Sequence, residues 1–88
     1  MPKLVRELTI QNPQGLHARP AAILVQLVSK YNSVVNIVKD GQRVNGSSIM
    51  GILTLGVQQG VTVTVEVDGD DAEDLMKEIE TFLTQEEM

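Results

Sequence analysis

The stretch "VTVTVEVD", residues 61–68, constrains the fold of this chain more than any other feature. Its four valines alternate with threonine and acidic residues, which is the pattern of a strand with one buried face and one solvated face. Residues 4–10, "LVRELTI", alternate in the same way, with Leu8 and Ile10 on the buried side. Strands with one wet face are typical of an antiparallel sheet that is covered on one side only.

Two further strands are predicted on either side of Asp40-Gly41. This pair of residues readily adopts the positive backbone angles of the tight turn that joins two antiparallel strands. The strands would cover residues 34–39 and 42–45, "VVNIVK" and "QRVN". The pattern therefore predicts a hairpin in the middle of the chain.

Three segments have helical character. Residues 18–31 are rich in Ala and Leu, and the short apolar segment 49–55 follows Ser48, a favourable N-cap residue. The last helix opens with Asp70 and Glu73, which have the spacing of a capping box. The helix over 18–31 is expected to bury a shared face made of Ala18, Ala21, Ala22, Val25 and Val28.

The predicted order of elements is strand, helix, strand, strand, helix, strand, helix. Because each strand has a polar face, we predict an α+β fold, an open-faced two-layer sandwich with a four-stranded antiparallel sheet and three helices on one face. The chain has 88 residues, which is a suitable length for one domain that spans residues 1–88.

Composition narrows the classes of function. The absence of cysteine excludes disulfides and thiolate metal sites. The net charge is −5 and the basic residues are scattered, which argues against nucleic acid or an anionic membrane as a partner and favours proteins. No apolar run approaches the roughly 20 residues that cross a bilayer, and the first residues lack the apolar core of a signal peptide, so we expect a cytoplasmic protein.

The only histidine, His17, precedes the predicted helix 18–31 and lies at or beside its N-cap. Histidine is a poor N-cap, because a short side-chain oxygen is what satisfies the free amides at a helix start. Those amides, the positive end of the helix dipole and the guanidinium of Arg19 all favour an incoming anion. Pro20 fits the first turn, where its missing N–H removes no hydrogen bond. The pattern predicts that a phosphoryl group on His17 would be stabilised there.

His17 has two other interpretations. A lone histidine in a small domain is usually an ordinary surface residue, and its position alone does not exclude this. A metal site is disfavoured, because one histidine without cysteine leaves too few ligands for zinc.

Two helical segments carry more apolar residues than one sheet face can cover. Between Ala21 and Val28 only Gln26 is polar, and residues 49–55 have the same surplus. One explanation is that neighbouring loops cover the excess. The other is an exposed surface for a protein partner. We expect such a docking surface beside His17, formed by Ala22, Ile23, Ile49, Met50 and Leu53.

The segments "GLHARPAA", residues 15–22, and "SSIMGILTLG", residues 47–56, resemble the histidine-containing phosphocarrier family, HPr, of the bacterial sugar phosphotransferase system. The resemblance implies the βαββαβα fold and a phosphocarrier. One histidine and no cofactor motif cannot complete a catalytic turnover, so we expect a carrier that is passed between enzymes, not an enzyme, and no cofactor. The family resemblance implies that His17 accepts a phosphoryl group on Nδ1 from enzyme I, which is charged by phosphoenolpyruvate, and passes it to enzyme IIA. Arg19 would neutralise phosphate charge during transfer.

The resemblance also implies regulation and further partners. In many Gram-positive members the serine before "IMG", here Ser48, is phosphorylated by a kinase, and a transcriptional regulator is a further partner. The apolar positions Ile49, Met50 and Leu53 match those that dock enzyme I, enzyme IIA and the kinase. We expect a monomer.

Two departures from the family pattern leave alternatives open. The predicted helix 18–31 has only Arg19 and Lys30 as basic residues, so recognition is expected to depend more on apolar contact. Gly46 and Ser47 replace a larger apolar residue and a lysine, so Ser47 competes with Ser48 as a kinase target, and Ser48 is alternatively a helix cap alone. The alternatives for function are the carrier of the nitrogen-related phosphorelay and a purely regulatory HPr-like binding module.

Overall fold

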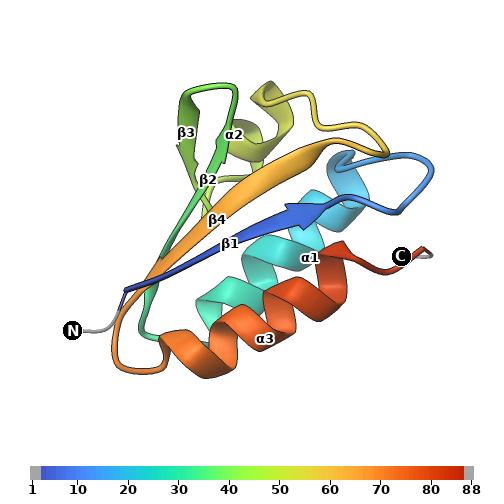
Figure 1. Cartoon of the computed structure of the whole chain (residues 1–88). Helices are drawn as coiled ribbons and strands as arrows, with labels where there is room; N and C mark the ends of the chain where they lie inside the picture. The colour runs from blue at the N-terminus through green and yellow to red at the C-terminus, as the bar shows by residue number, and fades with distance from the viewer. Residues whose placement is uncertain (1–2, 87–88) are drawn as a thin grey trace.

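The computed structural model describes residues 3–86 and confirms the predicted architecture (Figure 1). A single four-stranded sheet has the strand order β1-β4-β2-β3, and every neighbouring pair is antiparallel. The three helices cover one face of the sheet and leave the other face open (Figure 1). The elements are β1 (Lys3–Thr9), α1 (Ala18–Ser29), β2 (Val34–Lys39), β3 (Gln42–Asn45), α2 (Ile49–Thr54), β4 (Thr62–Asp68) and α3 (Ala72–Leu83).

The valines of β4 form the centre of the core, as their alternation predicts. Val63, Val65 and Val67 are fully buried, whereas the residues between them are more exposed. Because antiparallel partners lie on the same face of a sheet, their partners Leu8 on β1 and Ile37 on β2 are also buried. The helices close this layer with buried side chains that include Leu24, Ile52, Leu75 and Ile79.

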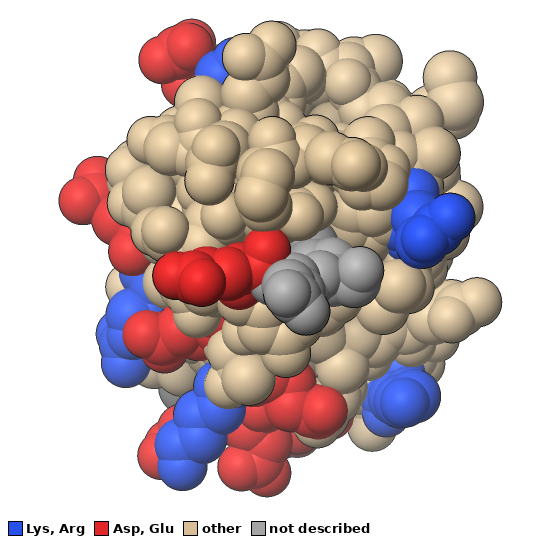
Figure 2. Space-filling view, turned by 90° about the vertical axis from the view of Figure 1, so that its right-hand side faces the viewer, with Lys and Arg blue, Asp and Glu red and all other residues tan. Residues whose placement is uncertain are grey.

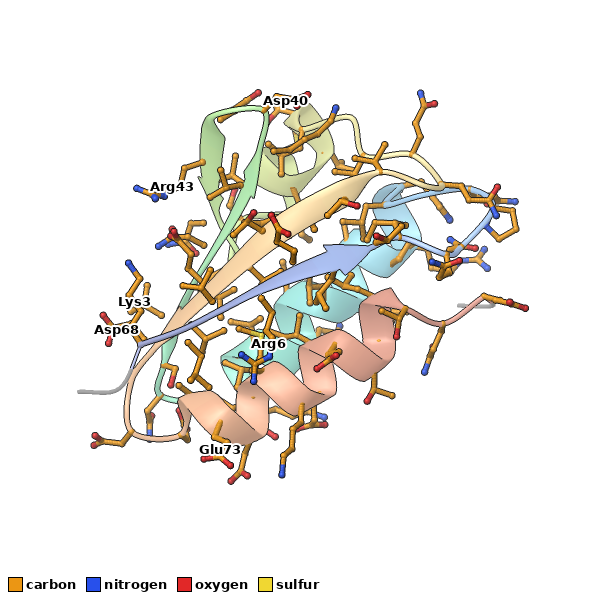
Figure 3. All side chains as sticks on the ribbon, in the orientation of Figure 1. Lys3, Arg6, Asp40, Arg43, Asp68 and Glu73 are labelled. Atoms are coloured by element: carbon orange, nitrogen blue, oxygen red, sulfur yellow. The ribbon has the colours of Figure 1, made fainter. Side chains whose placement is uncertain are left out.

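The open face of the sheet is mostly polar. Figure 3 shows Lys3, Arg43 and Asp68 on the side of the sheet away from the helices. Arg43 forms an ion pair with Glu66 at 3.0 Å, and with 60% of its side chain exposed the pair contributes little to stability. Arg6 differs, because its register places it on the helix side of the edge strand β1, where its side chain points toward α3 (Figure 3).

The inward face of α1 differs from the predicted one. Ala18 is exposed and the helix ends at Ser29 rather than at residue 31. The residues that α1 buries are Pro20, Ala21, Leu24 and Val28. The bulky side chain of Leu24 takes a core position, and this rotates the buried stripe away from Ala18.

The start of α3 also differs from the prediction. Its N-cap is Asp71 rather than Asp70, and the Asp71 side chain makes no bond to its own helix. The carboxylate instead accepts a hydrogen bond from the Asn32 backbone N–H at 2.8 Å and another from the Ser33 hydroxyl. These bonds favour the ionised form, led by the one from Ser33, and hold the pKa of Asp71 below its usual range. The hydrogen bonds between Asp71 and the loop before β2 therefore take the place of the predicted capping box.

Candidate functional site

The loop before α1 is held to the segment after α2. Asn12 is buried, and its side-chain amide donates to the carbonyl oxygen of Gly15 at 3.0 Å. The N–H of Leu16 donates to the carbonyl oxygen of Val57 at 3.0 Å. Gly15 has a φ of 67°, and a Cβ at this position would collide with the Val57 carbonyl group, so the close approach requires glycine. These contacts fix the point at which the chain enters α1.

His17 is the N-cap residue of α1, in agreement with the sequence prediction. Its backbone is extended, with φ −80° and ψ −171°, and its carbonyl oxygen accepts from the N–H of Ala21 at 3.0 Å. The imidazole makes no capping hydrogen bond and is half-buried. The backbone of His17 therefore closes the first turn, while its side chain is not used to satisfy the helix start.

The helix start beside His17 has unused hydrogen-bond donors. Within residues 3–86, no protein acceptor engages the backbone N–H of Ala18 or of Arg19, and Pro20 has no N–H to offer. The Arg19 side chain is exposed and pairs with no carboxylate in the described part of the chain. The first turn of α1 also lacks acidic residues. Free amides, the positive end of the helix dipole and a guanidinium group together suit an anion such as phosphate.

The start of α2, unlike that of α1, is capped by a side chain. The Ser48 hydroxyl accepts a hydrogen bond from the Gly51 N–H at 3.0 Å, which confirms the predicted N-cap. Ser48 is half-buried, whereas its neighbour Ser47 is exposed. At the other end of α2, the Lys39 ammonium group donates to the carbonyl oxygen of Leu55 at 2.9 Å. This six-residue helix is thus tied down at both ends by side chains.

Helices α1 and α2 are in contact, and both leave apolar side chains at the surface. Met50 is 69% exposed, and Ile23 and Ile49 are each 39% exposed. Ala22 and Leu53 are half-buried, and Leu53 also packs against the core. Of the predicted docking residues, three are therefore exposed and two are only partly accessible. We call the set of Ala22, Ile23, Ile49, Met50 and Leu53 the apolar patch.

Acidic residues are distributed unevenly along the chain. Between residues 8 and 65 the only acidic residue is Asp40, at the tip of the β2–β3 turn, whereas six of the other eleven lie between residues 70 and 80, in α3 and directly before it. Figure 2 looks onto the end of the molecule where the loops before α1 and before β4 lie; much of its upper half is uncharged, and most of the acidic side chains lie along its left side and in its lower centre. The chain segment that contains His17 therefore contributes little negative charge of its own.

Other kinds of site find little support in the described residues. Within residues 3–86, no three side chains among His, Cys, Asp and Glu lie close enough together to hold a metal ion. None of the described helices is long and apolar enough to cross a membrane.

Comparison with solved structures shows close relatives along almost the whole chain. Phosphocarrier protein HPr from Bacillus anthracis is 32% identical with a TM-score of 0.91, and the match covers 96% of this chain and 100% of that one. HPr-C-His from Thermoanaerobacter tengcongensis is 43% identical with a TM-score of 0.84, covering 94% and 91% of the two chains. The catabolite repression protein Crh of Bacillus subtilis, described as an intertwined dimer with a swapped domain, is 34% identical with a TM-score of 0.77, covering 94% and 95%.

A family model gives the same result from sequence. Residues 4–85 match the model described as the PTS HPr component phosphorylation site. The family match, the shared fold and the near-complete coverage agree with one another and confirm the resemblance that the two motifs indicate. The chain therefore belongs to the HPr family of phosphocarrier proteins of the bacterial phosphotransferase system.

Proposed function

We propose that His17 carries the phosphoryl group, accepting it from phosphorylated enzyme I and passing it to enzyme IIA of sugar transporters. The observation that carries the proposal is the start of α1, where an accessible imidazole replaces a capping side chain beside two amides that have no protein acceptor. A histidine kept for stability would be expected to bond to the helix or to pack in the core. His17 does neither, although its backbone is firmly placed.

The transfer step uses the groups at this helix start. Nδ1 of the neutral imidazole attacks phosphorus, the new N–P bond forms as the bond to enzyme I breaks, and the electron pair of that bond returns to enzyme I. The ring proton stays on Nε2. The N–H groups of Ala18 and Arg19 and the Arg19 guanidinium are the donors available to the phosphate oxygens, whose charge they would offset. The second transfer, to enzyme IIA, reverses these steps with a new acceptor, so the protein acts as a carrier and is returned unchanged.

A rate measurement tests this assignment of roles. Incubation with phosphoenolpyruvate and enzyme I should add one phosphoryl group to the protein, and omission of enzyme I should add none. Arg19→Ala should slow this transfer by about 10- to 100-fold, the effect of losing one charge-assisted hydrogen bond, without stopping it. Arg43→Ala, which removes the same type of side chain from the open face of the sheet, is the matched control and should transfer at the normal rate. Equal rates for the two variants would contradict the role of Arg19.

The apolar patch is proposed as the surface that docks enzyme I, enzyme IIA and a kinase in turn. Its exposure supports this role, because large apolar side chains grouped at a surface are typical of protein interfaces. The apolar patch lies within residues 8–65, which contain a single acidic residue. This low negative charge favours partners whose docking sites are acidic. We further propose that the protein acts in the cytoplasm, where phosphoenolpyruvate is made, and as a monomer.

Ser48 is proposed as a site of regulatory phosphorylation. A phosphate on this residue would add about two negative charges at a helix N-terminus, which the helix tolerates, and would oppose an acidic partner at the adjacent apolar patch. Ser47 is the rival, because it is the more exposed of the two hydroxyls. Treatment with an HPr kinase and ATP, followed by peptide mapping of Ser48→Ala and Ser47→Ala, separates them. Retention of phosphate in Ser48→Ala would assign it to Ser47.

A purely regulatory binding module is the second candidate. Its support is the likeness to Crh, which matches this chain at 34% identity. His17 favours the carrier, since a protein that only docks a transcriptional regulator has no need for a nucleophile at the start of α1. The nitrogen-related phosphorelay would use the same chemistry, and the sugar branch is preferred because "NGSSIMG" extends the family match to the serine. Transfer from the carrier to an enzyme IIA of each branch distinguishes them.

A further inference from the structure

A groove in the surface lies between α1 and α3, and its lining contains neither His17 nor Ser48. Figure 1 shows these two helices side by side, running in opposite directions on the covered face of the sheet. The groove between them has a volume of about 420 Å³, which is within the range of sites for small organic molecules. The residues that line it are Ile23, Gln26, Leu27, Lys30, Lys77, Glu78, Thr81, Phe82 and Gln85.

Two cations lie at one end of this groove. Because the helices are antiparallel, Lys30 at the end of α1 lies opposite the half of α3 that contains Lys77 (Figure 1). Both lysines are exposed, and neither pairs with a carboxylate within residues 3–86. Glu78 is the only acidic residue in the lining, so the groove has a net positive charge in a chain whose net charge is −5. This local reversal of sign favours an anion.

The rest of the groove is apolar. Leu27 and Phe82 are half-buried and pack against the core from the two helices, and Phe82 is the only phenylalanine of the chain. Ile23, 39% exposed, continues the apolar surface toward the other end. A ligand that matched this arrangement would therefore need an apolar body as well as a negative group.

We propose that the α1–α3 groove binds an amphipathic organic anion, a monocarboxylate with a medium-length hydrocarbon chain. The carboxylate would lie between Lys30 and Lys77, and the hydrocarbon chain would contact Leu27 and Phe82. The charge and the apolar lining point to the same class of molecule. An inorganic anion would not contact the apolar side chains of the groove, and a neutral hydrocarbon would not interact with the two ammonium groups. The groove contains neither His17 nor Arg19, so binding of this anion does not depend on the phosphoryl chemistry, although Ile23 belongs to both the groove and the apolar patch.

Titration with sodium octanoate, followed by the amide signals of the ¹⁵N-labelled protein, tests the proposal. The shifts should saturate and be confined to residues 23–30 and 77–85. Lys30→Gln and Lys77→Gln should each weaken binding by about threefold and the double variant by about tenfold, as expected for exposed ion pairs. Lys3→Gln, on the open face of the sheet, is the matched control and should bind octanoate normally.

One further variant and one control ligand complete the test. Thr81→Trp should fill the groove and abolish the saturable shifts while leaving both lysines in place. 1-Octanol, which has the same chain without the charge, should bind more weakly than octanoate. Unchanged octanoate affinity in the double lysine variant, equal binding of octanol, or shifts located elsewhere would each overturn the proposal. Because no phosphate is transferred in these titrations, their failure would leave the assignment of His17 untouched.

Discussion

The starts of α1 and α2 solve the same physical problem in different ways. Each helix begins with amides that have no partner within the helix. At α2, the Ser48 hydroxyl accepts one of them at 3.0 Å. At α1, the His17 side chain accepts none, and the amides of Ala18 and Arg19 have no acceptor within residues 3–86. The protein caps the start of α2 with a side chain and leaves the start of α1 without one.

The missing cap makes the start of α1 less stable than the start of α2. A side-chain cap is worth about 1 kcal/mol, so α1 begins with a deficit that α2 does not have. The loop before α1 compensates by other means, because the bonds of Asn12, Gly15 and Leu16 hold the chain in position. These contacts position the backbone at His17 without using its imidazole.

The largest effect is expected from His17→Ala. Phosphate uptake from enzyme I should be abolished, because the nucleophile is removed. The free energy of unfolding should change by no more than about 1 kcal/mol, because no capping bond is lost. Mass spectrometry after incubation with phosphoenolpyruvate and enzyme I, together with urea unfolding, measures both. A variant that lost most of its stability would show that His17 is structural and would remove the contrast with Ser48.

Met50→Glu should have the next largest effect. Placing a charge on the most exposed residue of the apolar patch should weaken binding of enzyme I by more than about 1 kcal/mol, the usual cost at the centre of an interface. Val34→Glu is the matched control, since Val34 is 56% exposed on the open face of the sheet. Calorimetric titration of both variants measures the difference. Equal affinities for enzyme I would refute the placement of the interface on α1 and α2.

Ser48→Ala should lower the free energy of unfolding by about 1 kcal/mol, because the amide of Gly51 loses its acceptor. Ser47→Ala removes the neighbouring hydroxyl, which caps no helix, and should change stability by less than about 0.5 kcal/mol. Ser48→Asp should keep the cap and the melting temperature but slow phosphoryl transfer from enzyme I. Normal transfer by Ser48→Asp would leave Ser48 as a cap and nothing more.

His17→Ser should act in the opposite direction. A hydroxyl at the N-cap of α1 should satisfy an amide that histidine leaves free and raise the free energy of unfolding by about 0.5 to 1 kcal/mol. Urea unfolding of this variant against wild type provides the measurement, with His17→Ala as the reference that adds no cap. No gain in stability from serine over alanine would mean that the start of α1 is already satisfied.

The smallest effect concerns the third helix start, and it disappears in acid. The pKa of Asp71 is lowered in the folded protein by its bonds to Ser33 and Asn32, so this carboxylate stabilises the fold fully above its unfolded pKa. The contribution is lost as the pH falls through the lower folded pKa. Asp71→Asn should therefore reduce the melting temperature at pH 6 and flatten its decline between pH 5 and pH 2. A parallel decline in both proteins would contradict the assignment.

The sequence contains most of what determines this fold. Alternating valines at 61–68, the Asp40-Gly41 turn and the cap at Ser48 are local signals, and the structure confirms each of them. The predictions failed where tertiary contacts decide the outcome. The Asp71 carboxylate bonds to the loop before β2 instead of to its own helix, and Leu24 displaces Ala18 from the buried stripe.

The candidate site was predictable in part. Its candidate residues lie in two short motifs, so His17, Arg19 and Ser48 could be proposed from local pattern and resemblance. The scaffold that positions His17 could not, because Asn12 and Gly15 look like ordinary turn residues until the approach of Val57 is seen. The glycine and the asparagine in "NPQG" were the only signals available. The groove between α1 and α3 was likewise missed, since it depends on how two helices pack.

The central claim is that the uncapped start of α1 exists to hold a phosphoryl group on His17. The most direct measurement is to phosphorylate the wild-type protein with phosphoenolpyruvate and enzyme I, locate the phosphate by peptide mass spectrometry, and follow its loss in acid and in base. We predict one phosphoryl group on His17, which is rapidly lost in acid and retained in base, as expected of a phosphorus–nitrogen bond. Phosphate that survives acid, or that maps to a serine while His17 is unmodified, would contradict the account.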